Sequence, residues 1–350
     1  MKQKVAFFIV LTLMLAILAG CVGTPVVYYG DCTCPSGGHS TPTPSNPPAE
    51  GAVKTGLAVI TNISDSENAK HANYDVTLVA VTVDDKGVID SCVIDSIGTK
   101  VTFDATGTIT SDLNAEIKSK NELGDSYGMV NYGGAKYEWY QQAAALADYA
   151  KGKTVAELKN GAIDETGKAP AGSDLASTAT IYLGGYVSAI EVAVNNAKHL
   201  GAQAGDTLKL AAISSISDSK STADGKDGTA QLNVDVTALT AKNDIITSCY
   251  IDSVQGKVTF DVTGTITSDL TAPVQTKNQL GDSYGMVAWG GAKYEWYQQA
   301  ANFAAYVTGK TAAQVAGIAV TEGKPSDADL STSVTIAIGG FQALIAKAMR

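Results

Sequence analysis

The chain has 350 residues, of which 45% are apolar, and a formal net charge of −10. An acidic chain without clustered Lys or Arg cannot neutralise phosphates, so nucleic acid is excluded as a partner. The three histidines, His39, His71 and His199, have no counterparts between the two repeats described below. A histidine triad or histidine metal site common to both repeats is therefore excluded.

The N-terminal segment has the pattern of a secretory signal. Lys2 and Lys4 precede an apolar run that begins at Val5 and closes on Leu18-Ala19-Gly20-Cys21. A run this short, followed by small residues and a cysteine, predicts a lipoprotein signal peptide over residues 1–20. Cys21 is then the lipidation site, and its acyl chains, such as palmitate, anchor the protein at the extracellular face of the cell membrane. An ordinary signal peptide with an incidental cysteine is the alternative.

Residues 21–52 are predicted to form a tether. The segment is rich in Pro, Thr, Ser and Gly, as in Thr41-Pro42-Thr43-Pro44, a composition that cannot bury a core. About 30 residues of flexible chain span roughly 30 Å, which lifts a domain off a membrane. Cys32 and Cys34 lie in this tether as surface thiols or as a strained disulfide.

The remainder of the chain is an internal duplication. Cys249 follows Cys92 at an offset of 249 − 92 = 157, and at this offset Asn121–Ala144 recurs as Asn278–Ala301 with three differences. This pattern predicts two tandem domains, at residues 53–200 and 201–350. Both cysteines lie in apolar runs that read as strands, and we expect them to be buried as small hydrophobic side chains.

Strands and helices are both predicted within each repeat. Apolar residues alternate at Val76, Leu78 and Ala80, and with the apolar run from Val88 to Ile94 they predict two strands around the turn Asp84–Gly87. Amphipathic spacing predicts helices over 138–150 and 295–307. Mixed strands and helices predict an α+β fold, with a mixed sheet and packed helices.

The last part of each repeat has further helix signals. Thr154 with Glu157, and Thr311 with Gln314, fit the capping box that starts a helix. Residues 178–183 read as a strand, and the Gly184-Gly185 pair leads into an apolar helix.

Each repeat also contains a threonine six residues after an aspartate. The segments are Asp174 to Thr180, Asp-Leu-Ala-Ser-Thr-Ala-Thr, and Asp329 to Thr335, Asp-Leu-Ser-Thr-Ser-Val-Thr. They resemble the FMN-binding domains of the sodium-pumping NADH:quinone oxidoreductase C subunit and its Rnf relatives, whose motif reads Asp-x-x-Ser-Gly-Ala-Thr before a helix. The motif glycine is replaced by Thr178 or Ser333 here. The resemblance implies that a flavin transferase attaches FMN to Thr180 and Thr335 by phosphoester bonds.

A signal with a lipobox, a tether and two such domains also resembles the PplA-type flavinylated extracellular electron-transfer lipoproteins of Gram-positive bacteria. That resemblance implies an electron carrier that accepts electrons from a membrane quinol-linked donor and passes them to ferric iron or soluble flavins. Two alternatives stay open. The first is a flavin-dependent extracellular reductase of one specific acceptor. The second is a cofactor-free lipoprotein built of repeats that serves as an adhesin or binding protein.

Two further groups of residues complete the expected FMN sites. Glycines at a helix start let a phosphate approach free backbone amides, and the candidates are Gly184, Gly185, Gly339 and Gly340. Aromatic side chains stack on an isoalloxazine ring, and the candidates are Tyr127, Trp139, Tyr284 and Trp296. Core packing is the alternative for these aromatics.

Carboxylates recur between the repeats as well. Such pairs fit a paired-acid hydrolase, or solvated turns and strand ends. The recurring pairs are Asp95 with Asp252, Asp125 with Asp282, and Glu138 with Glu295.

Overall fold

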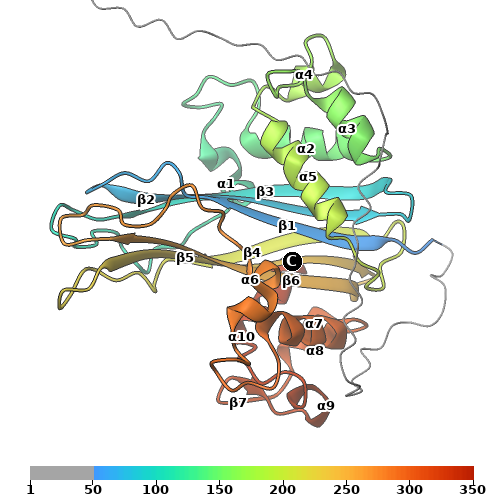
Figure 1. The fold of residues 1–350 in the computed structure, drawn as a ribbon. Coiled ribbons are helices and arrows are strands. Elements are labelled where there is room, and N and C mark those ends of the chain that lie inside the picture. Colours follow the sequence, from blue (N-terminus) through green and yellow to red (C-terminus); the bar gives the residue numbers. More distant parts are fainter. Residues whose placement is uncertain (1–50) are drawn as a thin grey trace, which may run out of the picture. The chain divides into compact units, whose positions relative to one another are not determined.

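Three long strands open each repeat and form an antiparallel sheet in the order of the sequence (Figure 1). The computed structural model describes residues 51–350, so the signal peptide, Cys21, Cys32, Cys34 and the tether up to residue 50 lie outside the described residues. The strands of the first repeat are β1 (Lys54–Asn62), β2 (His71–Val83) and β3 (Ile89–Thr102). Those of the second are β4 (Thr207–Ser215), β5 (Gly228–Lys242) and β6 (Ile245–Phe260).

The predicted turn between β2 and β3 is confirmed. The carboxylate of Asp84 accepts hydrogen bonds from the backbone amides of Lys86 and Val88, both at 2.8 Å. Gly87 has a φ of 80°, a conformation that glycine adopts without strain. An aspartate and a glycine thus close the turn locally.

Helices follow the strands in both repeats, and the predicted α+β class is confirmed. The predicted mixed sheet is wrong, because all strand pairs among the described residues are antiparallel. In the first repeat they are α1 (Lys120–Leu123), the 3₁₀ helix η1 (Gly124–Tyr127), α2 (Trp139–Ala150), α3 (Val155–Ala162), α4 (Asp174–Thr178) and α5 (Gly184–Asn195). In the second they are α6 (Lys277–Leu280), η2 (Gly281–Tyr284), α7 (Trp296–Val307), α8 (Ala312–Ala316), α9 (Ala328–Ser331) and α10 (Gly339–Ala348), with two short strands, β7 (Val320–Thr321) and β8 (Lys324–Pro325), between α8 and α9.

The predicted helix starts are confirmed at several positions. Glu138 and Glu295 are the N-caps of α2 and α7. Thr154 and Thr311 cap α3 and α8, and each hydroxyl accepts the amide of the third helical residue. These boxes satisfy amides that have no partner within the helix.

The predicted strand over residues 178–183 is wrong. Thr178 ends the short helix α4, and the following residues form a loop before α5. The backbone amides of Thr180 and Ile181 donate to the side-chain oxygen of Gln142, and the amide of Leu183 donates to the carbonyl of Gly167. Because these groups find partners in a side chain and a loop, no neighbouring strand is needed to satisfy them.

The sheets stack face to face, with helices on each outer side (Figure 1). Successive side chains of a strand point to opposite faces of its sheet. In β2, Tyr74, Val76 and Leu78 therefore join the core between the sheets, whereas Val79 and Val81 join the core under α2 and α5. The resulting order of layers is helices, sheet, sheet, helices (Figure 1). The outer face of the first sheet is buried under the helices, whereas Asp75, Gly98 and Lys100 at its other end are exposed.

The core between the sheets is built from both repeats. The rings of Phe103 and Phe260 stack with centroids 4.0 Å apart and planes 3° from parallel. Tyr74 is fully buried and its hydroxyl donates to the carbonyl of Ala230 across the seam at 2.8 Å. The two repeats therefore share one hydrophobic core within residues 51–350.

Reciprocal backbone bonds tie the repeats together at the strand ends. The amide of Ala69 donates to the carbonyl of Gly264 at 2.7 Å, and the amide of Thr222 donates to the carbonyl of Gly107 at 2.9 Å. Gly107 has a φ of 67°, and a Cβ there would lie 2.5 Å from the Thr222 hydroxyl. Each repeat therefore places a loop against its neighbour.

Cys92 and Cys249 lie in β3 and β6 as buried side chains, as the sequence predicts. Burial raises the pKa of both thiols to about 12. A thiol that keeps its proton is a poor nucleophile and behaves as a small hydrophobic group.

Candidate functional site

A pocket of about 440 Å³ opens on the helix side of the first sheet. Its volume lies in the range of small-molecule sites. Three residues predicted from the sequence meet there, Tyr127, Trp139 and Gly185. The full lining is Thr77, Lys120, Tyr127, Met129, Trp139, Ile181, Tyr182, Gly185 and Tyr186.

Thr180 directly precedes the pocket residues Ile181 and Tyr182, and its side chain is exposed. Its hydroxyl donates to Oε1 of the buried Gln142 at 3.2 Å. The same oxygen accepts the backbone amides of Thr180 at 2.8 Å and Ile181 at 3.1 Å. Nε2 of Gln142 donates to the carbonyl of Tyr137 at 2.9 Å, and this bond fixes the orientation of the glutamine side chain. Its oxygen in turn holds the loop of Thr180.

Thr335 is held in the same way in the second repeat. Oε1 of the buried Gln299 accepts the Thr335 amide at 2.8 Å, its hydroxyl at 3.2 Å and the amide of Ile336 at 3.2 Å. Nε2 of Gln299 donates to the carbonyl of Tyr294 at 2.8 Å. The structure thus gives both threonines an exposed side chain and the same set of partners.

The loop of each threonine leads into a helix start without a side-chain cap. These starts are Gly184 of α5 and Gly339 of α10. The Gly184 amide donates to the carbonyl of Gly167, but no acceptor among residues 51–350 is bonded to the amides of Gly185 and Tyr186. Free amides and the helix dipole together favour an anion at this position.

A lysine in each repeat lies over the candidate ring-binding aromatics. Nζ of Lys120 is 5.2 Å from the ring centroid of Tyr127 and 5.1 Å from that of Trp139. In the second repeat, Nζ of Lys277 is 5.3 Å from the Tyr284 centroid and 4.8 Å from the Trp296 centroid. Sequence analysis missed both lysines, although they stand at the common offset of 157 directly before the repeated segment.

Glu138 fixes the loop that forms one wall of the pocket. Its two carboxylate oxygens accept the backbone amides of Met129 and Val130, both at 2.9 Å. Glu295 makes the equivalent two bonds in the second repeat. These buried carboxylates stabilise a loop, and no proton-transfer partner is found for them among the described residues.

The other recurring carboxylates also hold local structure. Oδ1 of Asp95 accepts the amides of Ser96 and Asn121, at 2.7 and 3.1 Å. Oδ1 of Asp125 accepts the hydroxyl of Tyr140 at 3.2 Å. The contacts of these side chains give no support to a paired-acid hydrolase.

Several residues predicted for the site are not part of the pocket lining. Asp174 and Asp329 are exposed in the first turns of the short helices α4 and α9. Gly184 lies beneath Tyr182, since a Cβ there would be 2.5 Å from the tyrosine hydroxyl oxygen. Gly185 has no such close neighbour and faces the pocket.

We expect Asp252 to make stability depend on pH. Burial raises its pKa from 3.8 to about 6 in the folded protein. Between about pH 4 and pH 6 the folded state therefore keeps this proton while the unfolded chain loses it, so the free energy of unfolding falls as the pH rises through this range. Asp252→Asn should remove this cost, about 3 kcal/mol at pH 7, because the amide oxygen still accepts the amides of Ser253 and Asn278.

Urea denaturation of the two proteins between pH 4 and pH 7 measures this effect. The stability of the variant relative to the native protein should increase over that range. Glu165→Gln at an exposed site is the matched control and should show no such trend. A constant difference between Asp252→Asn and the native protein would contradict the prediction.

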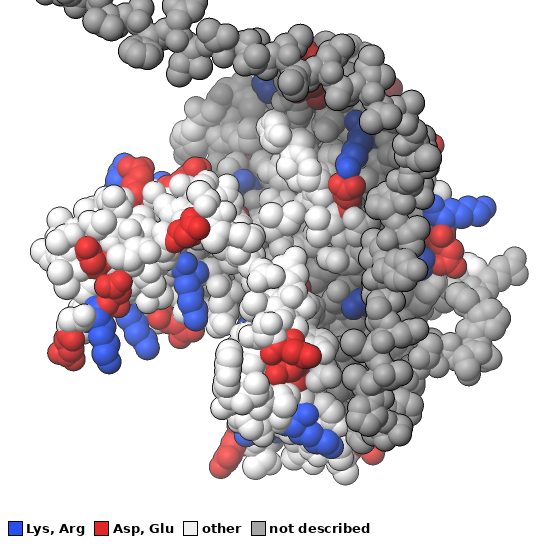
Figure 2. Space-filling model, viewed as in Figure 1, with Lys and Arg blue, Asp and Glu red and all other residues white. Residues whose placement is uncertain are grey.

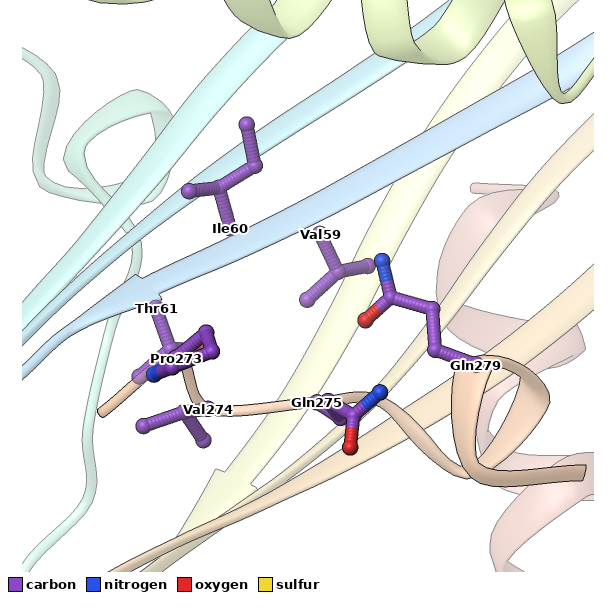
Figure 3. Close-up of a pocket in the computed structure, with 7 residues that line it drawn as sticks. All are labelled: Val59, Ile60, Thr61, Pro273, Val274, Gln275 and Gln279. Carbon is purple, nitrogen blue, oxygen red and sulfur yellow. The ribbon is translucent and has the colours of Figure 1, made fainter.

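A second pocket lies at the seam of the repeats and is larger, at about 530 Å³ (Figure 3). It has no ionisable side chain in its lining. Its lining is Val59, Ile60 and Thr61 of β1 with Pro273, Val274, Gln275 and Gln279 of the second repeat. Val59 and Thr61 point toward the second-repeat residues, whereas Ile60 points to the other side of the strand. Of these two pockets, only the smaller one beside Thr180 has a charged side chain, Lys120, in its lining.

Acidic and basic side chains are interspersed on the face shown in Figure 2. Within residues 51–350, no group of three or more His, Cys, Asp and Glu side chains is placed to hold a metal ion. In the same range, no helix has the length and apolar content needed to cross a bilayer.

No family model, curated protein or solved structure matches the chain.

Proposed function

We propose that the protein is a membrane-anchored extracellular electron carrier with FMN joined to Thr180 and Thr335 by phosphoester bonds. The observation that carries this proposal is the shared geometry of the two threonines. Each is exposed, bonded to a buried glutamine, and separated by only a few residues from a helix start that lacks a side-chain cap. Residues 53–200 and 201–350 are then tandem FMN-binding domains.

The residues around Thr180 fit FMN in both size and chemistry. The free amides of Gly185 and Tyr186 suit a phosphate. Tyr127 and Trp139 supply the aromatic wall of a pocket of about 440 Å³. Lys120 places a positive charge in the same lining, which favours a group that gains negative charge on reduction.

Attachment requires a flavin transferase that uses FAD. The phosphoryl group of the FMN half forms a bond to the threonine Oγ as the pyrophosphate bond breaks, AMP leaves, and the hydroxyl loses its proton. In this chain, Gln142 and Gln299 hold the two loops so that the hydroxyls stay on the surface. When bound, FMN supplies the uptake and release of electrons, and the protein supplies position and electrostatics.

The proposed location is the outer face of the cell membrane, between an electron donor in the membrane and acceptors outside the cell. Lipidated Cys21 anchors the chain at the extracellular face of a Gram-positive cell membrane, and the tether gives the folded part its reach. A membrane quinol-linked protein donates electrons, and ferric iron or soluble flavins accept them. A covalent bond keeps the cofactor on a protein that faces a dilute exterior.

Intact mass of the protein co-produced with an active flavin transferase tests the attachment sites. We expect two added FMN groups in the native chain, one in Thr180→Val or Thr335→Val, and none in the double variant. The neighbouring hydroxyls provide matched controls, since Thr178→Val and Thr332→Val should both retain two. A native chain without added FMN, beside a control substrate that is flavinylated, would refute the proposal.

A further inference from the structure

The two candidate sites differ in charge at one position. Thr77 of β2 lines the pocket of the first repeat and pairs with Ser96 of β3. The counterpart of Ser96 is Ser253 of β6, since 253 − 96 = 157, and it pairs with Asp235 of β5. Asp235 therefore stands where the first repeat has Thr77, and both side chains are half-buried.

The carboxylate of Asp235 reaches the start of α10. A Cβ on Gly340 would lie 3.6 Å from Oδ2 of Asp235. Gly340 is the counterpart of Gly185, which lines the pocket in the first repeat. The carboxylate has no hydrogen-bond donor among the described residues, so its charge is not neutralised by a direct partner.

Asp235 also acts on the ionisable groups of its site. Burial lowers the pKa of Lys277, and the charges of Asp235 and Asp252 oppose that shift. Burial raises the pKa of Tyr284, Lys257 counteracts the shift, and Asp235 adds to it. The carboxylate is therefore close enough to both side chains to influence their protonation.

Elsewhere the counterparts of the pocket residues keep the same charge. Lys120 corresponds to Lys277 at the offset of 157, so both sites have this lysine. The tyrosine, methionine and tryptophan positions of the pocket are also occupied by the same residue types in both repeats, Tyr127 and Tyr284, Met129 and Met286, and Trp139 and Trp296. Tyr182 and Tyr186 are replaced by Ala337 and Phe341, which removes two hydroxyls without changing the charge. The second site thus has one additional negative charge.

We propose that the two repeats hold the same redox group at two different midpoint potentials, and that the carboxylate of Asp235 sets the lower one in the second repeat. This inference rests on the proposed function. An electron added beside a fixed carboxylate is repelled by it. A unit charge at the edge of such a pocket changes the equilibrium constant for adding one electron by about tenfold, which is about 59 mV.

The difference in midpoint potential has a functional consequence because the two sites lie apart. The neighbours of Thr77 (Val76 and Leu78) and of Asp235 (Val234 and Val236) lie in the core between the sheets, so Thr77 and Asp235 point to the outer faces of their sheets. Helices lie on both of these outer sides (Figure 1), and the two sites are therefore on opposite sides of the shared core. Each site therefore meets external donors and acceptors separately. Two potentials on one chain widen the range of molecules that exchange electrons with it.

Single-site proteins allow the two potentials to be measured independently. Thr180→Val leaves only the second site flavinylated, and Thr335→Val leaves only the first. Potentiometric titration with dithionite and ferricyanide, followed by flavin absorbance, should give a potential about 59 mV lower in Thr180→Val, the shift for a tenfold change with one electron. Equal potentials in the two proteins would overturn the inference.

Charge exchange between the sites provides matched variants. Asp235→Asn in the Thr180→Val protein should raise its potential toward that of the first site. Thr77→Asp in the Thr335→Val protein should lower its potential by a similar amount. If Thr335 is flavinylated only after Asp235→Asn, the carboxylate excludes the phosphate instead, and the inference is wrong.

A measurement without flavin separates this inference from the proposed function. In the flavin-free protein, Asp235→Asn should lower the pKa of Lys277 further, as measured by NMR of the lysine side chains. Absence of FMN from both threonines refutes the carrier function. An unchanged pKa of Lys277 overturns the electrostatic role of Asp235, whether or not flavin is attached.

Discussion

Phe103→Ala and Phe260→Ala are each expected to lower the free energy of unfolding by about 3–5 kcal/mol. Both side chains are buried, at 2% and 0% exposure, and each ring fills space between the sheets against the other ring. Removal of either ring leaves a cavity in the core that both repeats share. The loss should therefore appear as one cooperative shift of the whole urea transition of residues 51–350.

A double-mutant cycle measures the contact between the two rings. Stacked aromatic pairs contribute about 0.5–1.5 kcal/mol beyond the area that they bury. The double variant should therefore lose less stability than the sum of the two single losses. Tyr132→Ala, at a position that is 91% exposed, is the control and should change stability by less than about 0.5 kcal/mol. Two separate unfolding transitions would contradict a shared core.

Gln142→Leu is expected to abolish flavinylation at Thr180 and to leave Thr335 flavinylated. The variant removes the acceptor of the Thr180 and Ile181 amides and the donor to the Tyr137 carbonyl. Unpaired polar groups at a buried position cost about 1–3 kcal/mol each, so the loop must move to reach water. The hydroxyl then no longer occupies the position that the transferase requires.

Intact mass and urea denaturation together test this role. Gln141→Leu is the matched control, because Oε1 of Gln141 accepts only the Glu138 amide at the helix start and does not contact the threonine loop. It should cost about 1 kcal/mol and retain both FMN groups. Full flavinylation of Thr180 in Gln142→Leu would show that the glutamine is only structural.

Much of the fold could be predicted because its signals are local. The alternation at Val76, Leu78 and Ala80 defines β2, and the capping box at Thr154 marks the start of α3. Burial on both faces of β2 has a weaker signal, the apolar stretch in its second half. The stacking of the two sheets on each other depends on contacts between distant residues, such as Phe103 and Phe260, that no periodicity specifies.

Only part of the candidate site could be predicted, because some of its features are local in sequence and others depend on contacts between distant residues. Tyr127, Trp139 and Gly185, which the sequence singles out, line one pocket, but the role of Gln142 depends on a contact across 38 residues. The difference between Thr77 and Asp235 was hidden because these strands align at 235 − 77 = 158, whereas the repeated segment aligns at 157. Strand register was needed to match the two positions.

The reciprocal bonds between Ala69 and Gly264, and between Thr222 and Gly107, have the form of an isologous interface. A homodimer of one repeat would make the same contacts twice, and both of its sites would have to carry the same residues. Joining two copies in one polypeptide removes that constraint and keeps the interface intact. Fusion thus fixes a ratio of one site of each kind per chain, and it lets position 77 and position 235 evolve independently.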